Sequence, residues 1–246
     1  MIAHWRRLGL CFAITLVVAL VARMPATWAI WGVRAWLPPD FHYAAVEGTV
    51  LGARFSGVRV DTAGALPVGT LELAPDWSRL VRGRLALAWR AVGADGVVEG
   101  SACRHGARWT LAAVQGRLDA DVLATLVPSL PPLRGALVLA GPSLDCSGAG
   151  ILAIDAAGLA LDGGPRLGDY AVELARSDDG AWQGTLVSRD AAALVIDAHL
   201  GRAPGQPGIE LTGTVHAGAA LPAAARAWFA LGADAAPQPF SWRIPL

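Results

Sequence analysis

The sequence predicts a mainly β protein, in which an N-terminal transmembrane helix is followed by a curved antiparallel β-sheet domain with a few short helices packed on it. Three observations support this prediction. A single apolar stretch stands near the N-terminus, apolar and polar residues alternate in short segments beyond it, and glycines recur from Tyr43 onward. The spacing of these glycines, about 8–12 residues, is typical of a β meander.

Composition narrows the function classes before any motif is considered. The 246 residues include 20 basic and 20 acidic side chains, so the net charge is zero, and 54% of the residues are hydrophobic. A nucleic-acid partner is not expected, because binding phosphates requires a basic excess. Disorder is not expected either, because disordered chains combine low hydrophobicity with high net charge. The hydrophobic residues must therefore face a membrane or a core.

The first 36 residues indicate a single membrane anchor. An uncharged apolar run over residues 8–22 is interrupted by Arg23, and apolar residues resume over 24–33. A spanning helix needs about 20 apolar residues, so we expect Arg23 to lie near an interface and extend its charge toward water. Aromatic side chains that fit a belt at the membrane interface follow the run, namely Trp28, Trp31 and Trp36.

Orientation follows from the basic residues that precede the anchor. Arg6 and Arg7 are expected to stay in the cytoplasm by the positive-inside rule. Residues 1–36 then form a cytoplasmic tip and one span of the inner membrane, and residues 37–246 form a periplasmic domain of a Gram-negative cell. The competing interpretation is a cleaved signal peptide, but the small residues that a cleavage site requires match poorly here.

Two cysteines lie in the part predicted to be exported. Cys11 falls inside the apolar run and is interpreted as a small hydrophobic residue. Cys103 and Cys146 remain as an even pair in a compartment where disulfides persist. Redox or metal chemistry would need a Cys-x-x-Cys pair or a cluster with His, and the chain has neither. The sequence leaves open whether Cys103 and Cys146 are bonded to each other.

Alternation of period two predicts strands along the exported part. In residues 84–89, Leu85, Leu87 and Trp89 fall on one face and smaller or charged residues on the other. The same habit recurs in residues 136–139, 170–174, 209–213 and 240–246. A Pro-rich link at 128–132 suggests two halves, 43–128 and 133–246. One continuous sheet is nevertheless expected, because neither half alone offers a large core.

Turns and short helices separate the predicted strands. Asp-Gly pairs at 95–96 and 179–180 indicate hairpin tips, and the tip is also the preferred interpretation of the acidic pair Asp178–Asp179. Asp76 is expected to cap a helix over 77–81, and Asp119 one over 120–127. Pro222 opens a third helix over 223–231. The first and third are amphipathic and are expected to lie over the sheet.

The sequence contains little that indicates chemistry. Its five histidines are not spaced for a helical metal site, and no nucleophile or phosphate-binding motif is present. We therefore expect no catalytic residue, no cofactor and no metal. The predicted sheet has one apolar face, which could pack under helices or could curl into a groove that holds an apolar ligand.

A series of short motifs resembles the family of type II secretion system protein N, a small inner-membrane subunit. The N-terminal anchor is followed by a stretch similar to the family's Gly-Thr-x-Trp-x-Gly-x-Ala-x-Gly pattern. The matching residues are Gly48, Thr49, Leu51, Gly52 and Gly57. Leu51 stands where a Trp is often found, and the register after Gly52 differs slightly.

The later motifs follow in the family's order. Residues 77–87 resemble a segment in which a Trp precedes a short helix and a Gly-Arg-Leu strand, and residues 115–118 resemble a second Gly-Arg-Leu unit. Toward the C-terminus the resemblance rests on Gly168, Tyr170, Trp182 and Gly184.

The resemblance implies a non-enzymatic accessory component of the machinery that exports folded proteins across the outer membrane. Its partners would be other inner-membrane subunits of the machine, with membrane lipid contacted through one span. Trp109 and Trp182, near predicted turns, are candidate contact residues if they are exposed. The alternative is an AsmA-like periplasmic protein that binds or transfers lipid in an apolar β groove.

Overall fold

The computed structural model describes most of the chain from residue 41 to residue 244 and short stretches before it. The described residues are 12, 15–16, 19–33, 41–61, 65–83, 85–105, 108–126, 130–141, 144, 146, 149–177, 181–189, 192–202, 208–218, 221–222, 226, 231 and 236–244. The named helices within them are α2 (Ala26–Val33), α3 (Trp77–Leu80) and α4 (Val122–Leu126).

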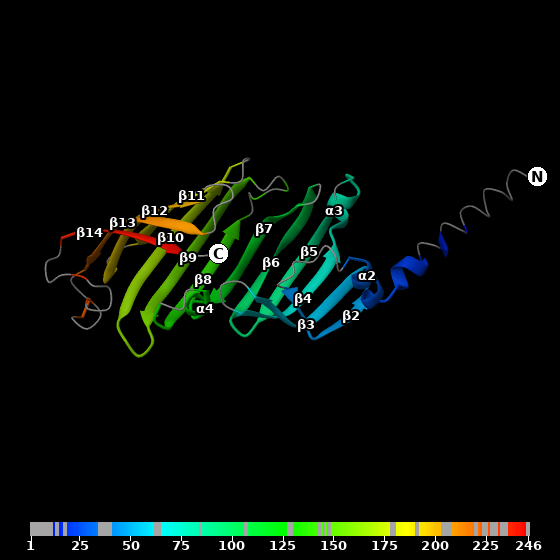
Figure 1. The fold of residues 1–246 in the computed structure, drawn as a ribbon, viewed down its shortest axis with the longest axis horizontal. Helices are drawn as coiled ribbons and strands as arrows, with labels where there is room; N and C mark the ends of the chain where they lie inside the picture. The colour runs from blue at the N-terminus through cyan, green and yellow to red at the C-terminus, as the bar shows by residue number, and fades with distance from the viewer. Residues whose placement is uncertain are drawn as a thin grey trace, which may run out of the picture.

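Fourteen strands within the described residues form one antiparallel sheet (Figure 1). The strands before the first short helix are β1 (Phe41–His42), β2 (Ala45–Thr49), β3 (Gly52–Asp61) and β4 (Ala65–Pro75). The next are β5 (Ala86–Gly93), β6 (Gly96–His105), β7 (Arg108–Asp119), β8 (Leu133–Gly141) and β9 (Gly150–Leu161). The last are β10 (Arg166–Arg176), β11 (Trp182–Arg189), β12 (Leu194–Arg202), β13 (Ile209–Ala217) and β14 (Gln238–Ile244).

The topology confirms the prediction of a single continuous meander. From β3 to β14 every strand pairs with the next one in the chain, while β1 and β2 both pair with β3. The link between the two suggested halves does not divide the sheet, because β7 and β8 pair directly on its two sides. The strand expected at 240–246 is β14, which pairs with β13.

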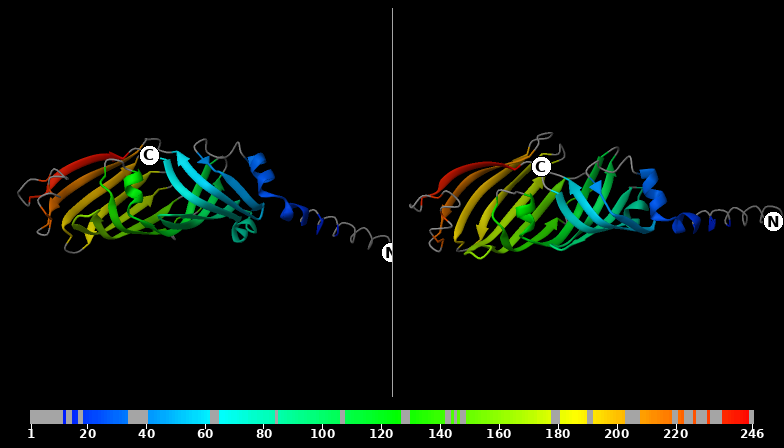
Figure 2. Two further views of the ribbon diagram at one scale, coloured as in Figure 1. Left: turned by 90° about the horizontal axis from the view of Figure 1, so that it is seen from below. Right: turned by 60° about the horizontal axis from the view of Figure 1, so that its bottom comes forward.

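The sheet is strongly curved (Figure 2). Its two faces also differ in chemistry. Paired registers place Phe55, Leu71 and Ala91 on one face of β3, β4 and β5, and Arg54, Glu72 and Arg90 on the other. α4 lies within the curve of the sheet, so the concave side is the apolar one (Figure 2). We call this apolar side the inner face and the polar side the outer face.

Bulges interrupt the ladder at several strand pairs and help the sheet to bend. Register shifts occur between β3 and β4, β6 and β7, β8 and β9, and β9 and β10. A bulge increases local twist and bends its strand. At the first of them Gly57 has a φ of +62°, and a Cβ there would lie 2.9 Å from that of Ala44, so this kink requires glycine.

The main core lies on the inner face at one end of the strands, which we call the α4 end. Val122 and Leu123 of α4 pack there against Leu137, Ala156 and Tyr170. Leu221 and Leu231 belong to the same cluster. Most of the predicted helix over 223–231 lies outside the described residues, although Arg226 is helical and its backbone N–H donates to the carbonyl of Pro222 at 3.0 Å. We call the opposite end of the strands the disulfide end.

The structure describes only part of the predicted membrane anchor and does not support a spanning helix there. Arg6, Arg7 and Trp36 lie outside the described residues, as does the side chain of Trp31. No helix in the described part of the chain is both long and apolar enough to span a bilayer. The chain turns at Pro25, which forms a β-bridge with Thr49, and α2 then packs Ile30 against Phe55 and Val58. The apolar residues of α2 therefore belong partly to the sheet's core, whereas Trp28 is 69% exposed.

Two predicted helix caps are also corrected. α3 begins after Asp76, but the side chain of Asp76 makes no capping hydrogen bond and instead accepts one from the Ser78 hydroxyl at 2.6 Å. Asp119 is the last residue of β7, and α4 starts three residues later at Val122. The expected hairpin tip at Asp178–Asp179 lies outside the described residues.

Candidate functional site

The inner face carries a half-buried apolar area toward the disulfide end, over which no described element packs. Its side chains come from neighbouring strands β8 to β12, and each is only partly buried. They are Leu139, Leu152, Val172, Leu174, Leu186 and Leu200. We call these six residues the open apolar surface.

The two ends of the inner face contrast in burial. Toward the α4 end, Leu137, Tyr170 and Leu194 are at most 7% exposed because α4 and the segment around Leu221 cover them. Toward the disulfide end, the same strands continue with apolar residues but no described element packs over them. A contiguous apolar area that is left partly open to solvent marks an interaction or ligand site in soluble domains. The open apolar surface is therefore the candidate functional site.

The rim of this surface is basic and aromatic. Arg176 ends β10, and Trp182 opposite it begins β11. The Arg176 guanidinium lies over the Trp182 ring, with 5.5 Å from its central carbon to the ring centroid. Arg202 at the end of β12 pairs with Trp182 from the other side. The Nε atom of Arg176 is buried and has no hydrogen-bond partner, so this cation is held without full compensation.

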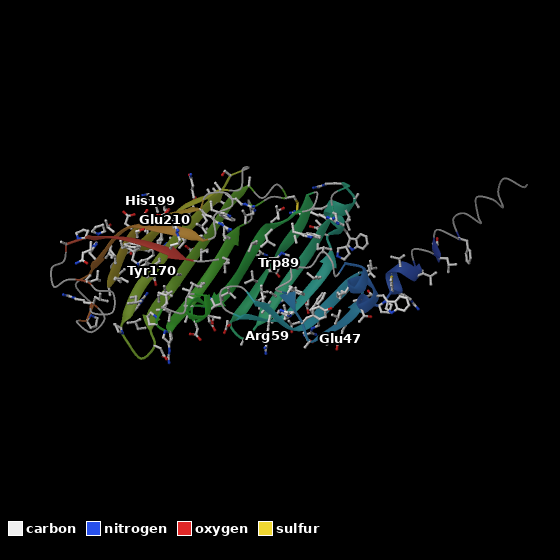
Figure 3. The ribbon with its side chains drawn as sticks, viewed as in Figure 1. Glu47, Arg59, Trp89, Tyr170, His199 and Glu210 are labelled. Carbon is white, nitrogen blue, oxygen red and sulfur yellow. A yellow bond between two sulfur atoms is a disulfide. The ribbon has the colours of Figure 1, made fainter. Side chains whose placement is uncertain are left out.

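The motif residues Gly168 and Tyr170 have a structural role at the α4 end, and Tyr170 is labelled in Figure 3. Gly168 sits at a bulge with a φ of +138°, and a Cβ there would lie 2.5 Å from that of Ala192. Tyr170 is buried, and its hydroxyl donates to the carbonyl of Leu194 at 2.8 Å. Together they fix β10 against the connection that leads into β12.

Electrostatics around this motif agree with a structural role. Burial raises the pKa of Tyr170 well above its usual value, so the hydroxyl keeps its proton and remains a donor. A hydrogen bond from the backbone N–H of Gly158 at 2.6 Å, and then the Arg166 guanidinium, lower the pKa of Asp169. Asp169 thus stays ionised and ties β9 to β10.

Replacing Tyr170 with Phe is expected to lower the free energy of unfolding by about 1 kcal/mol, the net value of one buried hydrogen bond. A urea titration measures this change. Tyr43→Phe is the matched control, since the half-buried Tyr43 ring packs on Phe55 at 5.4 Å and its hydroxyl makes no hydrogen bond with any described residue. Equal losses in the two variants would contradict the role assigned to the hydroxyl of Tyr170.

The first motif of the resemblance forms the β2–β3 hairpin. Gly48 has a φ of +95°, and a Cβ there would collide with the carbonyl oxygen of Gly52 at 2.2 Å. Thr49 Oγ1 accepts a hydrogen bond from the backbone N–H of Leu51, which is exposed in the turn. Gly52 begins β3. This motif therefore shapes one edge of the sheet and does not reach the open apolar surface.

A disulfide joins Cys103 to Cys146, with an S–S distance of 2.09 Å. Of the two alternatives that the sequence leaves open, the structure has the bonded one. The bond ties the connection after β8 to the outer face of β6. The Arg79 guanidinium of α3 lies against both sulfur atoms, 2.7 Å from that of Cys103 and 2.5 Å from that of Cys146. Asp76 holds Arg79 in place through an ion pair at 3.3 Å.

The two tryptophans proposed as contacts differ in exposure. Trp109 at the disulfide end of β7 is 40% exposed on the inner face. Trp182 is half-buried under Arg176, and Gly184, two residues on, leaves no room for a side chain because a Cβ would lie 2.2 Å from the carbonyl oxygen of Glu173. Trp109 is thus available for contact, whereas Trp182 forms part of the rim.

The outer face carries paired charges in place of an open apolar area. Arg54 and Glu72 lie 3.9 Å apart, as do Arg90 and Glu99, and Gln115 donates to Glu99 at 2.8 Å. These side chains line a shallow hollow that is open to solvent. Exposed pairs of this kind contribute about 0–1 kcal/mol each. We therefore interpret them as a solvated surface.

A second outer hollow crosses β10 to β13 and is lined by Glu173, His199 and Glu210, the last two on neighbouring strands (Figure 3). Across the described ranges, no three His, Cys, Asp or Glu side chains are grouped so that they could hold a metal ion.

Sequence reasoning did not identify the open apolar surface or Arg176 as site residues. Alternation revealed an apolar face, but the sequence offered no way to know which half of that face would be covered. The sequence contained one signal for the pair Arg176 and Trp182. The two residues flank a predicted hairpin, and strand pairing across a hairpin places such residues opposite each other.

Comparisons with known proteins add no relative. A scan against protein-family models, a search of curated proteins and a search of solved structures each found no match to this chain.

Proposed function

We propose that this protein is a non-enzymatic accessory component of the type II secretion machinery, held at the inner membrane by its N-terminal segment. The ordered series of motifs supports this proposal, from the residues that form the β2–β3 hairpin to those around Tyr170 and Trp182. These motifs occupy bends and pairings of one sheet. A binding or scaffolding subunit requires a sheet whose bends and strand pairings are fixed in this way.

An exposed surface for partners is also available. Trp109 is 40% exposed on the inner face near the sheet's disulfide end. Exposed aromatic residues dominate the binding energy of many interfaces, often at about 2 kcal/mol or more when truncated. Trp109 is therefore the residue that we assign to contact with another subunit of the machine.

Deleting the gene is expected to reduce the amount of secreted enzymes while the outer membrane stays intact. Complementation with Trp109→Ala should restore the protein level but not secretion, because about 2 kcal/mol corresponds to a roughly thirtyfold loss of affinity. Trp77→Ala is the matched control, since Trp77 is also exposed but lies on α3 over the outer face. Normal secretion in the deletion strain would refute the secretion role.

A second function is favoured by one specific observation, the open apolar surface on a concave face. Lipid-binding proteins need such a surface, because acyl chains gain about 0.8 kcal/mol for each CH₂ removed from water. The protein would then bind an acyl chain along the inner face. In the deletion strain, this function predicts a leaky outer membrane with normal secretion, the opposite of the first outcome.

A further inference from the structure

We propose that Cys103 and Cys146 form a redox-active disulfide, which a dithiol reduces by attack on Cys146, and that Arg79 stabilises the thiolate that leaves on Cys103. The inference does not depend on either function proposed above. The evidence consists of a cation placed against both sulfur atoms, the anchoring of that cation by α3 and the different exposure of the two cysteines.

The position of Arg79 favours the reduced state of the cysteine pair. Its Nη1 atom lies 2.7 Å from the sulfur of Cys103 and 2.5 Å from that of Cys146. A disulfide is neutral and its sulfur atoms are weak acceptors, so a guanidinium gains little from them. A thiolate carries a full charge, and charge-assisted hydrogen bonds are about twice as strong as neutral ones. Arg79 therefore stabilises the reduced pair more than the bonded one.

The surroundings of Cys103 make a cation necessary if its sulfur is to carry a charge. Cys103 is 2% exposed and packs with Ala86 and Ala112, which are fully buried. Apolar surroundings disfavour the thiolate form of a cysteine. Arg79 supplies the opposite charge within hydrogen-bond distance of that sulfur.

α3 holds the Arg79 side chain on the sulfur atoms. The Nε atom of Arg79 lies 3.3 Å from Oδ2 of Asp76, the residue that precedes α3. Asp76 in turn accepts hydrogen bonds from the hydroxyls of Ser78 at 2.6 Å and of Ser101 in β6 at 3.3 Å. The hydrogen bond from Ser78 lowers the pKa of Asp76, so the carboxylate stays ionised. Because Asp76 binds the Nε side of the guanidinium, Nη1 is directed toward the cysteines.

Exposure determines which sulfur a reductant attacks. Cys146 is half-buried, whereas Cys103 is enclosed. A thiolate of the dithiol attacks Sγ of Cys146, the bond to Cys103 breaks, and its electron pair leaves on Sγ of Cys103 beside Arg79. The second thiolate of the dithiol then attacks its own sulfur in the mixed disulfide and releases Cys146. Two electrons pass to the cysteine pair and the dithiol becomes a disulfide; of its two protons, Cys146 takes up one and water the other.

The test measures the equilibrium between the disulfide and the reduced pair in the full-length protein in dodecyl maltoside. A Cys11→Ala background leaves only the two exchanging cysteines. The protein is equilibrated at pH 8 with reduced and oxidised dithiothreitol in varied ratios and quenched with acid, and its free thiols are counted by maleimide labelling. Arg79→Gln should lower the equilibrium constant for reduction about tenfold, or about 30 mV for two electrons. It should also slow reduction, because a less stable thiolate leaves more slowly.

Two controls separate the charge of Arg79 from packing. Arg82→Gln removes the same charge from an exposed position in the turn after α3 and should leave the equilibrium constant unchanged. At pH 5, with a trace of thioredoxin to speed exchange, both reduced cysteines are largely protonated, so the effect of Arg79→Gln should disappear. Asp76 is ionised at both pH values and adds no pH dependence of its own. Circular dichroism establishes that each reduced variant is folded.

The outcomes judge the cation and the exchange separately. Equal equilibrium constants of the wild-type protein and a folded Arg79→Gln variant at pH 8 would overturn the role of Arg79. A difference that persists unchanged at pH 5 would overturn it too, because packing alone would then explain the shift. A rate of reduction that rises with urea as steeply as unfolding does would overturn attack on Cys146 in the folded protein.

Discussion

Removing the disulfide by replacing Cys103 and Cys146 with Ala is expected to lower the free energy of unfolding by about 4 kcal/mol. The two residues are 43 positions apart, and closing a loop of that length removes chain entropy from the unfolded state by about this amount. A second contribution comes from α3, whose Arg79 packs on the two sulfur atoms. Equilibrium unfolding in urea, followed by tryptophan fluorescence, measures the loss.

Reduction provides the control for this experiment. Dithiothreitol should destabilise the wild-type protein by a similar amount and should leave the double Ala variant unchanged. An equal response of the two proteins to the reductant would show that the effect comes from elsewhere. Far-UV circular dichroism is expected to remain that of a β protein in both, because the bond joins a connection to β6 and does not hold a strand pair together.

Replacing Phe55 with Ala is expected to cost 3–5 kcal/mol, the usual range for a large buried aromatic residue. Phe55 is 2% exposed and makes edge-on contacts with Phe41 and Tyr43, with ring centroids 5.9 Å and 5.4 Å apart. Ile30 of α2 completes the cluster. The cavity would therefore loosen α2 from the sheet as well as the edge strands β1 and β2.

Leu51→Ala is the matched control for Phe55→Ala. Leu51 also lies in the β2–β3 region but is exposed in the turn, so its truncation should stay within about 0.5 kcal/mol. Limited proteolysis adds a second measurement, because release of α2 should expose the chain near Pro25 to cleavage in Phe55→Ala alone. If both variants lost the same stability, Phe55 would not be the centre of this cluster.

Much of the fold could be predicted because strand signals are local. The alternation of Leu85, Leu87 and Trp89 is visible without any tertiary information, and Leu87 and Trp89 lie in β5. The same is true of β14. Hairpin connections of this kind force consecutive strands to pair, so a meander of short strands predicts its own topology.

Which of the apolar N-terminal residues pack on the sheet could not be predicted in the same way. An apolar segment indicates only that its side chains avoid water, and both lipid and a protein core satisfy that requirement. The apolar residues of α2 include Ile30, which packs against Phe55 some 25 positions later in the chain. Similarly, Asp76 has the residue type of a helix cap, but Ser78 and Arg79 compete for its carboxylate.

The sequence by itself determined that this protein is a β meander with one apolar face, a cysteine pair and short helices between strands. Only the tertiary structure decided that α4 and Leu221 cover one end of that face, whereas no described segment packs over the other end, between Leu139 and Leu200. The physical reason is that the alternation of apolar and polar residues along a strand assigns each residue to a face of the sheet but carries no information on the curvature of that sheet. Curvature comes from twist and bulges summed over many strands, and coverage depends on where distant connections fold back.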